Sequence, residues 1–299
     1  MYPLEFLNSK QWKLTLPDTT AQEIKIGGKP DLATYASDWF RLNATNDGVI
    51  FKVPSNGGHT KNSINPRSEL RELNADGSPA AWSTATGVHS MECEFSVDVL
   101  PYSPKNKPHV VTGQIHDGND DVTVFRVEGN PDQQTATIWI TDGNKTHGYK
   151  LTDSYKLGDR YRVGFNVENG AISYNFNGVR LAYFQVKKKT GCYFKVGTYN
   201  QDGGDTTKRP DGENVYAQVT LYAVQVCHSS TSSLTDGQCT GRAPGAVGEP
   251  AEPPPVVVPP TPPVIDVQPI IDALNAANTA LASVVAQVQA AIDKLSGMK

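Results

Sequence analysis

Residues 160–176 read RYRVGFNVENGAISYNF, two runs of alternating polar and apolar residues joined by the dipeptide Asn169-Gly170. A period of two is typical of strands with one buried face, and an Asn-Gly dipeptide between two such runs predicts a tight β-hairpin. Ten Asn-Gly or Asp-Gly dipeptides punctuate the chain, and further strand-like runs lie at residues 49–53, 92–99, 122–127, 135–140 and 216–226. Long helical periodicity is absent before residue 228. The sequence therefore predicts an all-β fold, an antiparallel β-sandwich of the jelly-roll type.

The composition changes abruptly after this β-rich region. From Ala243 to Pro263 the chain is dominated by Pro, Val, Ala and Glu, which is typical of a semi-stiff, extended linker. We expect three parts: a β-jelly-roll domain over residues 1–240, a Pro-rich linker over 241–263, and a C-terminal amphipathic helix over 264–299.

The C-terminal segment has an apolar repeat of seven residues. One set comprises Ile271, Asn278, Val285 and Ile292, and a second set, three positions later, comprises Leu274, Leu281, Val288 and Leu295. This pattern predicts a parallel coiled coil in which Asn278 forms a polar layer that sets the register. The chain is then a homo-oligomer through this helix. The alternative is a lone amphipathic helix that packs on the sandwich.

Charge and hydropathy exclude two classes of partner. The 299-residue chain has a net charge of −4, whereas nucleic-acid binders usually carry a broad basic surface, so we expect no nucleic acid. No apolar run is long enough to span a bilayer. The first residues, Met1-Tyr2-Pro3-Leu4, lack the basic and apolar regions of a secretory signal. A secreted location would need a signal trimmed from this chain or another export route.

The four cysteines favour an oxidising compartment. Cys227 and Cys239 enclose a short polar segment, which predicts a disulfide that closes a surface loop and supports a secreted, extracellular location. Cys93 lies on the apolar side of a strand and is interpreted as a small buried hydrophobe, while its pairing with Cys192 stays open. None of the cysteines has the paired spacing of a zinc site, and no metal is expected.

Two segments place polar groups on one face of a strand. Arg67, Glu69 and Arg71 alternate with other residues and so project together, and each guanidinium can bind a carboxylate through two hydrogen bonds. A salt-bridged, solvent-exposed strand explains the same row equally well. Gln114 and His116 also share a face, where an amide can donate to a carboxylate and an imidazole can accept a proton near neutral pH.

A third segment adds a Lys, a Tyr and a Gln with the same spacing. Lys195, Gly197, Tyr199 and Gln201 share one face, with Phe194 and Val196 on the other, and Gly197 is interpreted as leaving room for a ligand to approach the sheet. An edge strand with a solubilising Lys is the alternative interpretation. Taken together, the three segments supply cations, amides, an imidazole and a phenol on period-two positions. This combination suits the binding of a polyanion.

These segments, RSELR at 67–71, QIH at 114–116 and YFKVGTYNQ at 193–201, resemble in this order the three signature blocks of the alginate lyases of polysaccharide lyase family 7. The resemblance covers roughly residues 1–228 and does not include the linker or the tail. It implies a lyase that cleaves alginate, a polymer of mannuronate and guluronate, by β-elimination that leaves unsaturated uronate ends. It implies no cofactor and no metal, because guanidinium and amide groups take the electrophilic role.

The resemblance also implies a role for each site residue. Arg71 and Gln114, helped by Arg67, neutralise the substrate carboxylate so that the C5 proton can be removed. Tyr199 acts as the acid and, on mannuronate, also as the base, while His116 is the base on guluronate.

The remaining candidates bind or organise substrate. Glu69 orients the arginines, and the substrate-binding set comprises Arg67, Glu69, Lys195, Asn200 and Gln201. Ile115, between Gln114 and His116, accompanies activity on guluronate-containing blocks in this family. An endo-acting enzyme with some preference for such blocks is expected.

Three rival interpretations use the same residues differently. A lyase for another uronate polymer, such as glucuronan, would carry similar motifs. A glycoside hydrolase would need paired catalytic carboxylates on one strand face, and no such arrangement is present in the sequence. A non-catalytic module for acidic polysaccharides would keep the basic groove but would not need Gln114, His116 and Tyr199 together.

Overall fold

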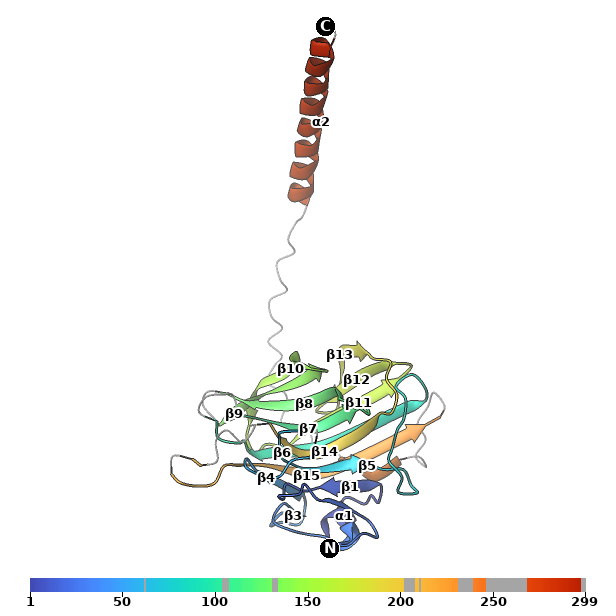
Figure 1. Cartoon of the computed structure of the whole chain (residues 1–299), viewed down its shortest axis with the longest axis vertical. Helices are drawn as coiled ribbons and strands as arrows, with labels where there is room; N and C mark the ends of the chain where they lie inside the picture. Colours follow the sequence, from blue (N-terminus) through green and yellow to red (C-terminus); the bar gives the residue numbers. More distant parts are fainter. Residues whose placement is uncertain are drawn as a thin grey trace. The chain divides into compact units, whose positions relative to one another are not determined.

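The chain forms two compact units, Met1–Ala246 and Val247–Lys299 (Figure 1). The computed structural model describes residues 1–61, 63–103, 108–130, 134–201, 208–209, 211–230, 239–245 and 268–296. The Pro-rich linker expected at 241–263 lies beyond residue 245 outside the described residues. The two units are described separately below.

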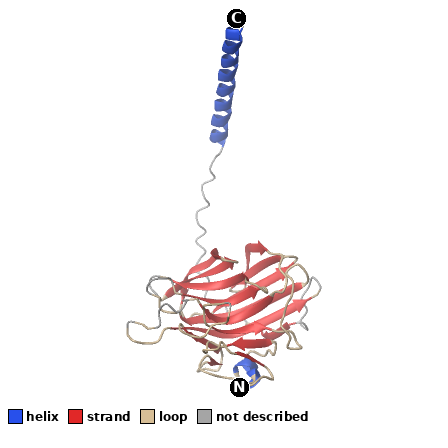
Figure 2. Ribbon diagram, viewed as in Figure 1, coloured by secondary structure: helices blue, strands red, loops and turns tan. Residues whose placement is uncertain are grey.

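The first unit is a sandwich of two antiparallel sheets, which confirms the predicted all-β fold (Figure 2). Sheet A has the order β10 (Lys145–Lys156), β9 (Thr135–Asp142), β8 (Asp121–Gly129), β7 (His109–His116), β14 (Tyr193–Asn200), β5 (Arg67–Glu72), β1 (Trp12–Thr15), β2 (Glu23–Lys25). Sheet B has the order β13 (Val179–Val186), β12 (Ala171–Phe176), β11 (Tyr161–Glu168), β6 (Val88–Val99), β15 (Tyr216–Ser229), β4 (Val49–Pro54), β3 (Phe40–Leu42), and β16 (Cys239–Arg242) pairs with β15. A short helix, α1 (Pro3–Phe6), and a 3-10 turn, η1 (Leu32–Thr34), complete the unit.

The hairpin that decides the fold is β11–β12. Asn169 and Gly170 have φ angles of 51° and 78°, and the strands on either side pair from Glu168–Ala171 outward. A turn with two positive φ values matches the twist of the strands it joins, which is why Asn-Gly is favoured there. Phe165 and Ile172 are fully buried, so the alternating pattern places the apolar side chains in the core as predicted.

Aromatic side chains from both sheets fill the space between them. The rings of Phe125 in sheet A and Phe165 in sheet B stack with centroids 4.3 Å apart, and Phe165 also faces Phe194 of β14 at 6.3 Å. Such pairs combine large apolar burial with favourable ring geometry. Since one face of sheet A is committed to this core, the polar residues that alternate with it are presented on the outer face.

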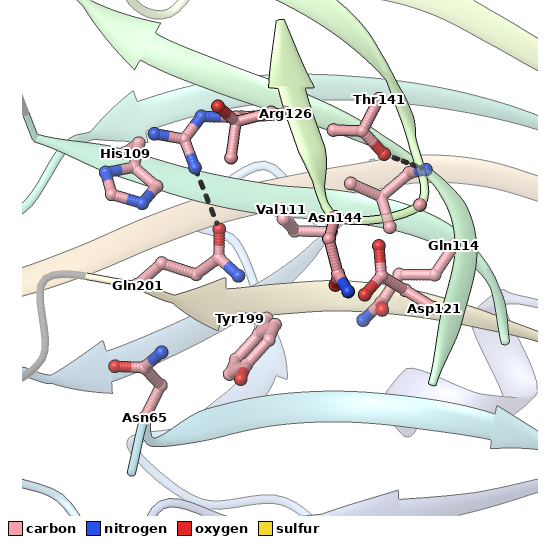
Figure 3. A pocket seen from close by; sticks show the side chains of 13 residues that line it. Asn65, His109, Val111, Gln114, Asp121, Arg126, Thr141, Asn144, Tyr199 and Gln201 are labelled. Atoms are coloured by element: carbon pink, nitrogen blue, oxygen red, sulfur yellow. Dashed lines mark hydrogen bonds between the residues drawn. The ribbon is translucent and has the colours of Figure 1, made fainter. Parts of the chain in front are cut away.

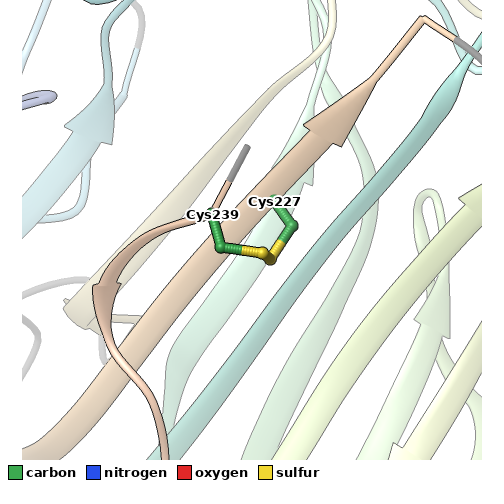
Figure 4. The surroundings of a disulfide bond; sticks show 2 residues. All are labelled: Cys227 and Cys239. Carbon is green, nitrogen blue, oxygen red and sulfur yellow. A yellow bond between two sulfur atoms is a disulfide. The ribbon is translucent and has the colours of Figure 1, made fainter. Parts of the chain in front are cut away.

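Cys227 at the end of β15 and Cys239 at the start of β16 are joined by a disulfide across 12 residues of sequence (Figure 4). Cys93 and Cys192 are free and buried. Burial raises the pKa of the Cys93 thiol well above its usual value, so Cys93 remains a neutral, apolar side chain.

The second unit contains α2 (Gln268–Ser296), a helix of 29 residues. Among its side chains that the structure describes, the large apolar ones that are exposed are Leu281, Val284, Val285, Val288 and Ile292. No helix among the described residues is long and apolar enough to cross a membrane.

Candidate active site

Strands β5, β14 and β7 lie side by side in sheet A, although they come from distant parts of the sequence. The register pairs Lys195 of β14 with Arg71 of β5 on one side and with Gln114 of β7 on the other. It also pairs Tyr199 with Arg67. Residues paired across strands project to the same face of a sheet. The three sequence segments thus combine into one polar surface on the outer face of sheet A.

This surface is the floor of a groove with a volume of about 460 Å³. The sequence-predicted residues that line it are Arg67, Arg71, Gln114, His116, Lys195, Tyr199 and Gln201. Apolar neighbours such as Leu70, Ile115 and Val196 are fully buried on the opposite face. The groove is therefore built by strict alternation within each strand and by register between strands.

Glu69 lies beneath the groove floor and is only 2% exposed. Its carboxylate binds three side chains of the floor. Its Oε2 is 2.5 Å from Lys195 Nζ and 3.4 Å from Arg67 Nη1, while its Oε1 accepts a hydrogen bond from Gln114 Nε2. Burial alone would raise the pKa of the Glu69 carboxyl, but the charges of Lys195 and Arg67 and these hydrogen bonds hold it below its usual value. The ionised carboxylate fixes the positions of both cations and of the amide.

Burial acts on the pKa of Lys195 in the opposite direction from that of Glu69, because it disfavours the charged ammonium. Burial, together with the charges of Arg67 and Arg71 and against the opposing effect of Glu69, lowers the pKa of the Lys195 ammonium to about 8. Lys195 is mostly charged at neutral pH and loses its charge in mild alkali. The groove is most cationic below that pH.

Each of the two arginines stacks on a tyrosine. The guanidinium carbon of Arg67 is 4.0 Å from the ring centre of Tyr199, and that of Arg71 is 3.9 Å from the ring centre of Tyr193. The Tyr199 hydroxyl is 3.0 Å from Ser63 Oγ. Arg71 lines the groove, and among the described residues no carboxylate lies within ion-pair distance of its guanidinium. The guanidinium can therefore bind the carboxylate of a ligand.

His116 is held by its backbone neighbour and by Tyr193. Its Nδ1 is 2.6 Å from the carbonyl oxygen of Asp117 and 3.1 Å from the Tyr193 hydroxyl. Because a carbonyl can only accept, we assign the proton to Nδ1, which leaves the lone pair on Nε2. Burial lowers the pKa of His116, and the charges of Lys195 and Arg67 lower it further. The imidazole is therefore neutral at pH 7 and able to take a proton.

A second cavity of about 220 Å³ continues the groove past Tyr199 and Gln201, which line both (Figure 3). Arg126 of β8 donates from Nη1 to Gln201 Oε1 at 3.3 Å, and its Nη2 is 2.9 Å from Glu128. The oxygen of the Gln201 amide is occupied by Arg126, and within the described part of the chain its N–H groups have no partner, so they can donate to a ligand. Asn144, from the turn between β9 and β10, also lines this cavity.

The chain matches the family described as Alginate lyase over residues 7–228. It belongs to that family. Among solved structures, the alginate lyase of Corynebacterium sp. is 39% identical with a TM-score of 0.67, covering 76% of this chain and 98% of that chain. Alginate lyase AlgAT5 from polysaccharide lyase family 7 is 36% identical with a TM-score of 0.66, covering 77% and 99%.

A third solved structure is a doubly substituted variant of the family 7 alginate lyase A1-II′ in complex with a substrate written GGMG. It is 25% identical to this chain with a TM-score of 0.62, covering 78% of this chain and 98% of that chain. The curated proteins contain no match. The chain is thus an alginate lyase, a polysaccharide-cleaving enzyme, and the interpretations as a hydrolase or a non-catalytic module are set aside.

Two residues of this alginate lyase do not lie where the sequence analysis placed them. Asn200, expected to bind substrate, is fully buried on the opposite face from Tyr199, and its Nδ2 donates to Ser55 Oγ at 3.2 Å. Gly197 does not make room for substrate. A Cβ added there would lie 2.5 Å from the backbone oxygen of Ser68 and 2.9 Å from Phe51, so the glycine allows close packing of β14 on its neighbours at a φ of 141°.

Several groove residues were not singled out from the sequence. Tyr193 lies two positions before Lys195, so the alternation used for the other residues of this segment would have found it. Arg126 and Glu128 likewise alternate within a strand-like run. Ser63 comes from a loop without any periodic signal. Asp121 lines both cavities, and burial, with the nearby Asp120, raises the pKa of its carboxyl to about 6.

We expect Glu69→Gln to destabilise the enzyme, because it leaves the buried Lys195 ammonium without its counter-charge. Removing one partner of a buried ion pair typically lowers the free energy of unfolding by roughly 3–5 kcal/mol. The matched control is Glu23→Gln at the Lys13–Glu23 pair, where Glu23 is 51% exposed, with a change within about 1 kcal/mol. Urea denaturation of both variants measures this. Equal stability of the two variants would contradict a central role for Glu69.

Proposed function

We propose that this alginate lyase cleaves inside alginate chains, with some preference for guluronate-containing blocks, using Arg71, Gln114, His116 and Tyr199 as its catalytic residues. The observation that carries the proposal is that these four side chains line one groove. The continuation of the groove into a second cavity, past Gln201, gives room for sugars on both sides of the cleaved bond. Such room favours cleavage within a chain over trimming at its end.

The first step is neutralisation of the uronate carboxylate. The C5 proton becomes acidic only when the negative charge that develops on the adjacent carboxylate is stabilised. Arg71 supplies a guanidinium that lines the groove and has no carboxylate partner among the described residues. Gln114 supplies the second N–H of an amide whose other N–H is fixed by Glu69. Both donors are held in place before substrate arrives.

The second step moves two protons. On guluronate, His116 Nε2 takes the C5 proton, the electron pair of the C–H bond forms the C4–C5 double bond, and the C4–O4 bond breaks. Tyr199 donates its hydroxyl proton to the departing O4. On mannuronate, where the C5 proton faces the other way, Tyr199 gives its hydroxyl proton to O4 and takes the C5 proton in its place. The electron pair of the C–H bond again forms the C4–C5 double bond as the C4–O4 bond breaks, and the phenol is regenerated. Ile115 is fully buried, so any influence on uronate choice acts through the positions of Gln114 and His116.

Substitutions on purified block substrates test these roles. We expect Tyr199→Phe to lower kcat on both polymannuronate and polyguluronate by about 10²–10⁴-fold, the usual contribution of a positioned acid or base. His116→Asn should lower kcat by a comparable factor on polyguluronate and much less on polymannuronate. The assay follows the ultraviolet absorbance of unsaturated uronate ends.

Tyr149→Phe and His59→Asn, both at exposed positions, serve as controls and should retain full activity. An equal loss on both polymers in His116→Asn would contradict its assignment as the guluronate base. Glucuronan is included as a third polymer. A higher kcat/KM on glucuronan than on either block would point to another uronate polymer as the preferred substrate.

The pH profile should have two limbs set by His116 and Lys195. His116, with a pKa held below 6.5 mainly by burial, is a base only above its pKa, so kcat/KM on polyguluronate should fall as the pH drops through that value. Lys195, with a pKa near 8, is charged only below that value, so kcat/KM should fall again above about pH 8 as KM rises. In Lys195→Met the alkaline limb should disappear and KM should be higher at every pH. An unchanged alkaline limb in this variant would refute the role of Lys195.

We further propose that the enzyme is secreted and assembles as a homo-oligomer through α2. The Cys227–Cys239 disulfide supports an oxidising compartment. The seven-residue repeat and the exposure of Leu281, Val285 and Val288 on α2 support assembly, because pairing with other copies of the helix would bury this apolar stripe.

Light scattering after size exclusion tests the assembly. The full chain should have a multiple of the 32.3 kDa chain mass, and Leu281→Asp, in the apolar stripe, should give a monomer. Ser283→Asp, on the opposite side of the helix, is the matched control and should keep the oligomer. A monomeric full chain would contradict the coiled coil and favour the lone helix.

A further inference from the structure

The outer face of sheet B carries an exposed patch at its β11–β12–β13 end. The register aligns Asn166 with Ser173 and Ser173 with Phe184 across the three strands. Neighbouring residues such as Phe165 and Ile172 point into the core, so this row points outward. The patch is on the other sheet from the catalytic groove, and the proposed mechanism does not use it.

A depression of about 650 Å³ lies on this patch, and it is larger than the catalytic groove. Phe184 lines it with a side chain that is 59% exposed. Four polar residues that can form hydrogen bonds with a ligand also line the depression: Asn166, Glu168, Ser173 and Arg180. An exposed aromatic ring among amide, hydroxyl and guanidinium groups suits a sugar, whose C–H face stacks on the ring while its hydroxyls bond at the edges.

Cations outnumber carboxylates around this depression, where Glu168 is the one acidic residue in the lining. Residues 179–189 contain Arg180, Lys187, Lys188 and Lys189 and no carboxylate. Lys187 is paired with Asp142, and Lys189 with Asp117 at 3.0 Å.

Arg180 and Lys188 differ from these two lysines. Within the described part of the chain neither has a carboxylate in ion-pair distance, and Arg180 Nη2 donates only to Ser173 Oγ at 3.1 Å. Lys188 lies beside the Asn169-Gly170 turn, since its Cγ would be 3.5 Å from a Cβ added at Gly170. Two cations without counter-charges therefore flank the depression.

The spacing of these cations fits a polymer better than a small anion. Eight residues separate Arg180 from Lys188, up to roughly 26 Å at about 3.3 Å per strand residue, with Phe184 midway. A second copy of this chain is disfavoured as the occupant. If two β13 edges paired antiparallel, the cations of one copy would face those of the other, and like charges facing each other across a sheet edge oppose pairing.

We propose that the outer face of β11–β13 is a second, non-catalytic binding site for an acidic polysaccharide, with Phe184 stacking on a sugar ring and Arg180 and Lys188 binding uronate carboxylates. The polymer is the enzyme's own substrate class, and that identity rests on the proposed function. A chain bound on sheet B keeps further segments of the same polymer at high local concentration near the groove on sheet A.

The test compares long and short substrates for the double variant Phe184→Ala/Arg180→Ala in the full-length protein. Binding to alginate polymer is measured in a Tyr199→Phe background, where cleavage is suppressed. We expect Kd for the polymer to rise about tenfold, below the 10²–10⁴-fold contribution of an ideal tethered contact. With Tyr199 intact, kcat/KM should fall on polymer and stay unchanged on an alginate tetrasaccharide, which is too short to reach both sheets.

Val179→Ala/Arg41→Ala removes a comparably exposed apolar side chain and an exposed arginine on β3 of the same sheet, both outside the depression, and should change neither value. Unaltered polymer binding in the Phe184/Arg180 variant would overturn the proposal. So would an equal loss on polymer and tetrasaccharide, which would place the effect in the groove. A change in molar mass by light scattering would identify the patch as a protein contact instead. If the unsubstituted enzyme cleaved none of the uronate polymers, the proposed function would be rejected. The comparison of Kd values would still test the binding site on sheet B.

Discussion

The ion pair between Glu69 and Lys195 is the interaction on which the groove depends. A carboxylate and an ammonium buried to this degree are tolerated only when each satisfies the other and further hydrogen bonds complete their shells. Glu69 meets this requirement by binding Lys195, Arg67 and Gln114, which come from three strands. The same contacts that make the burial possible also fix the side chains that face substrate. The geometry of the catalytic residues therefore depends on the register of the strands. A shift of β14 by one residue would turn Lys195 into the core.

This arrangement explains how a protein with a net charge of −4 acts on a polyanion. On β5 and β14 the floor presents three cations, Arg67, Arg71 and Lys195, with the carboxylate of Glu69 beneath them. Because Glu69 is fully buried, it offsets part of the charge without presenting an oxygen to the ligand. Arg71, which Glu69 does not bind, is left to meet the uronate. The local balance of charge, and not the total over the chain, determines what the groove attracts.

Alternation in the sequence predicted the sandwich and most of the groove, because within a strand it determines which side chains share a face. It grouped Arg67 with Arg71 and Gln114 with His116. It could not show that β14 lies between β5 and β7, since pairing between distant strands depends on the whole fold. The two misplaced residues have different causes. Asn200 directly follows Tyr199, so alternation places it on the other face, and only the motif resemblance had suggested a substrate contact. Gly197 is required by the backbone of β5, which no pattern within one segment can indicate.

The cations of the two sheets differ in a way that matches different tasks. In the groove, Lys195 and Arg67 are buried and held by Glu69, so little conformational entropy remains to be lost when substrate binds, and their geometry suits a reaction. Along β13, Arg180 and Lys188 lie at the exposed edge and have no carboxylate partner among the described residues, so they must be ordered by the ligand itself. Exposed charges of this kind add modest affinity each and are screened by salt. Each contact through these cations should be weak, so binding needs several contacts along one polymer chain. The groove, in contrast, selects the single bond that is cleaved. A long acidic polysaccharide can bind to both surfaces at the same time.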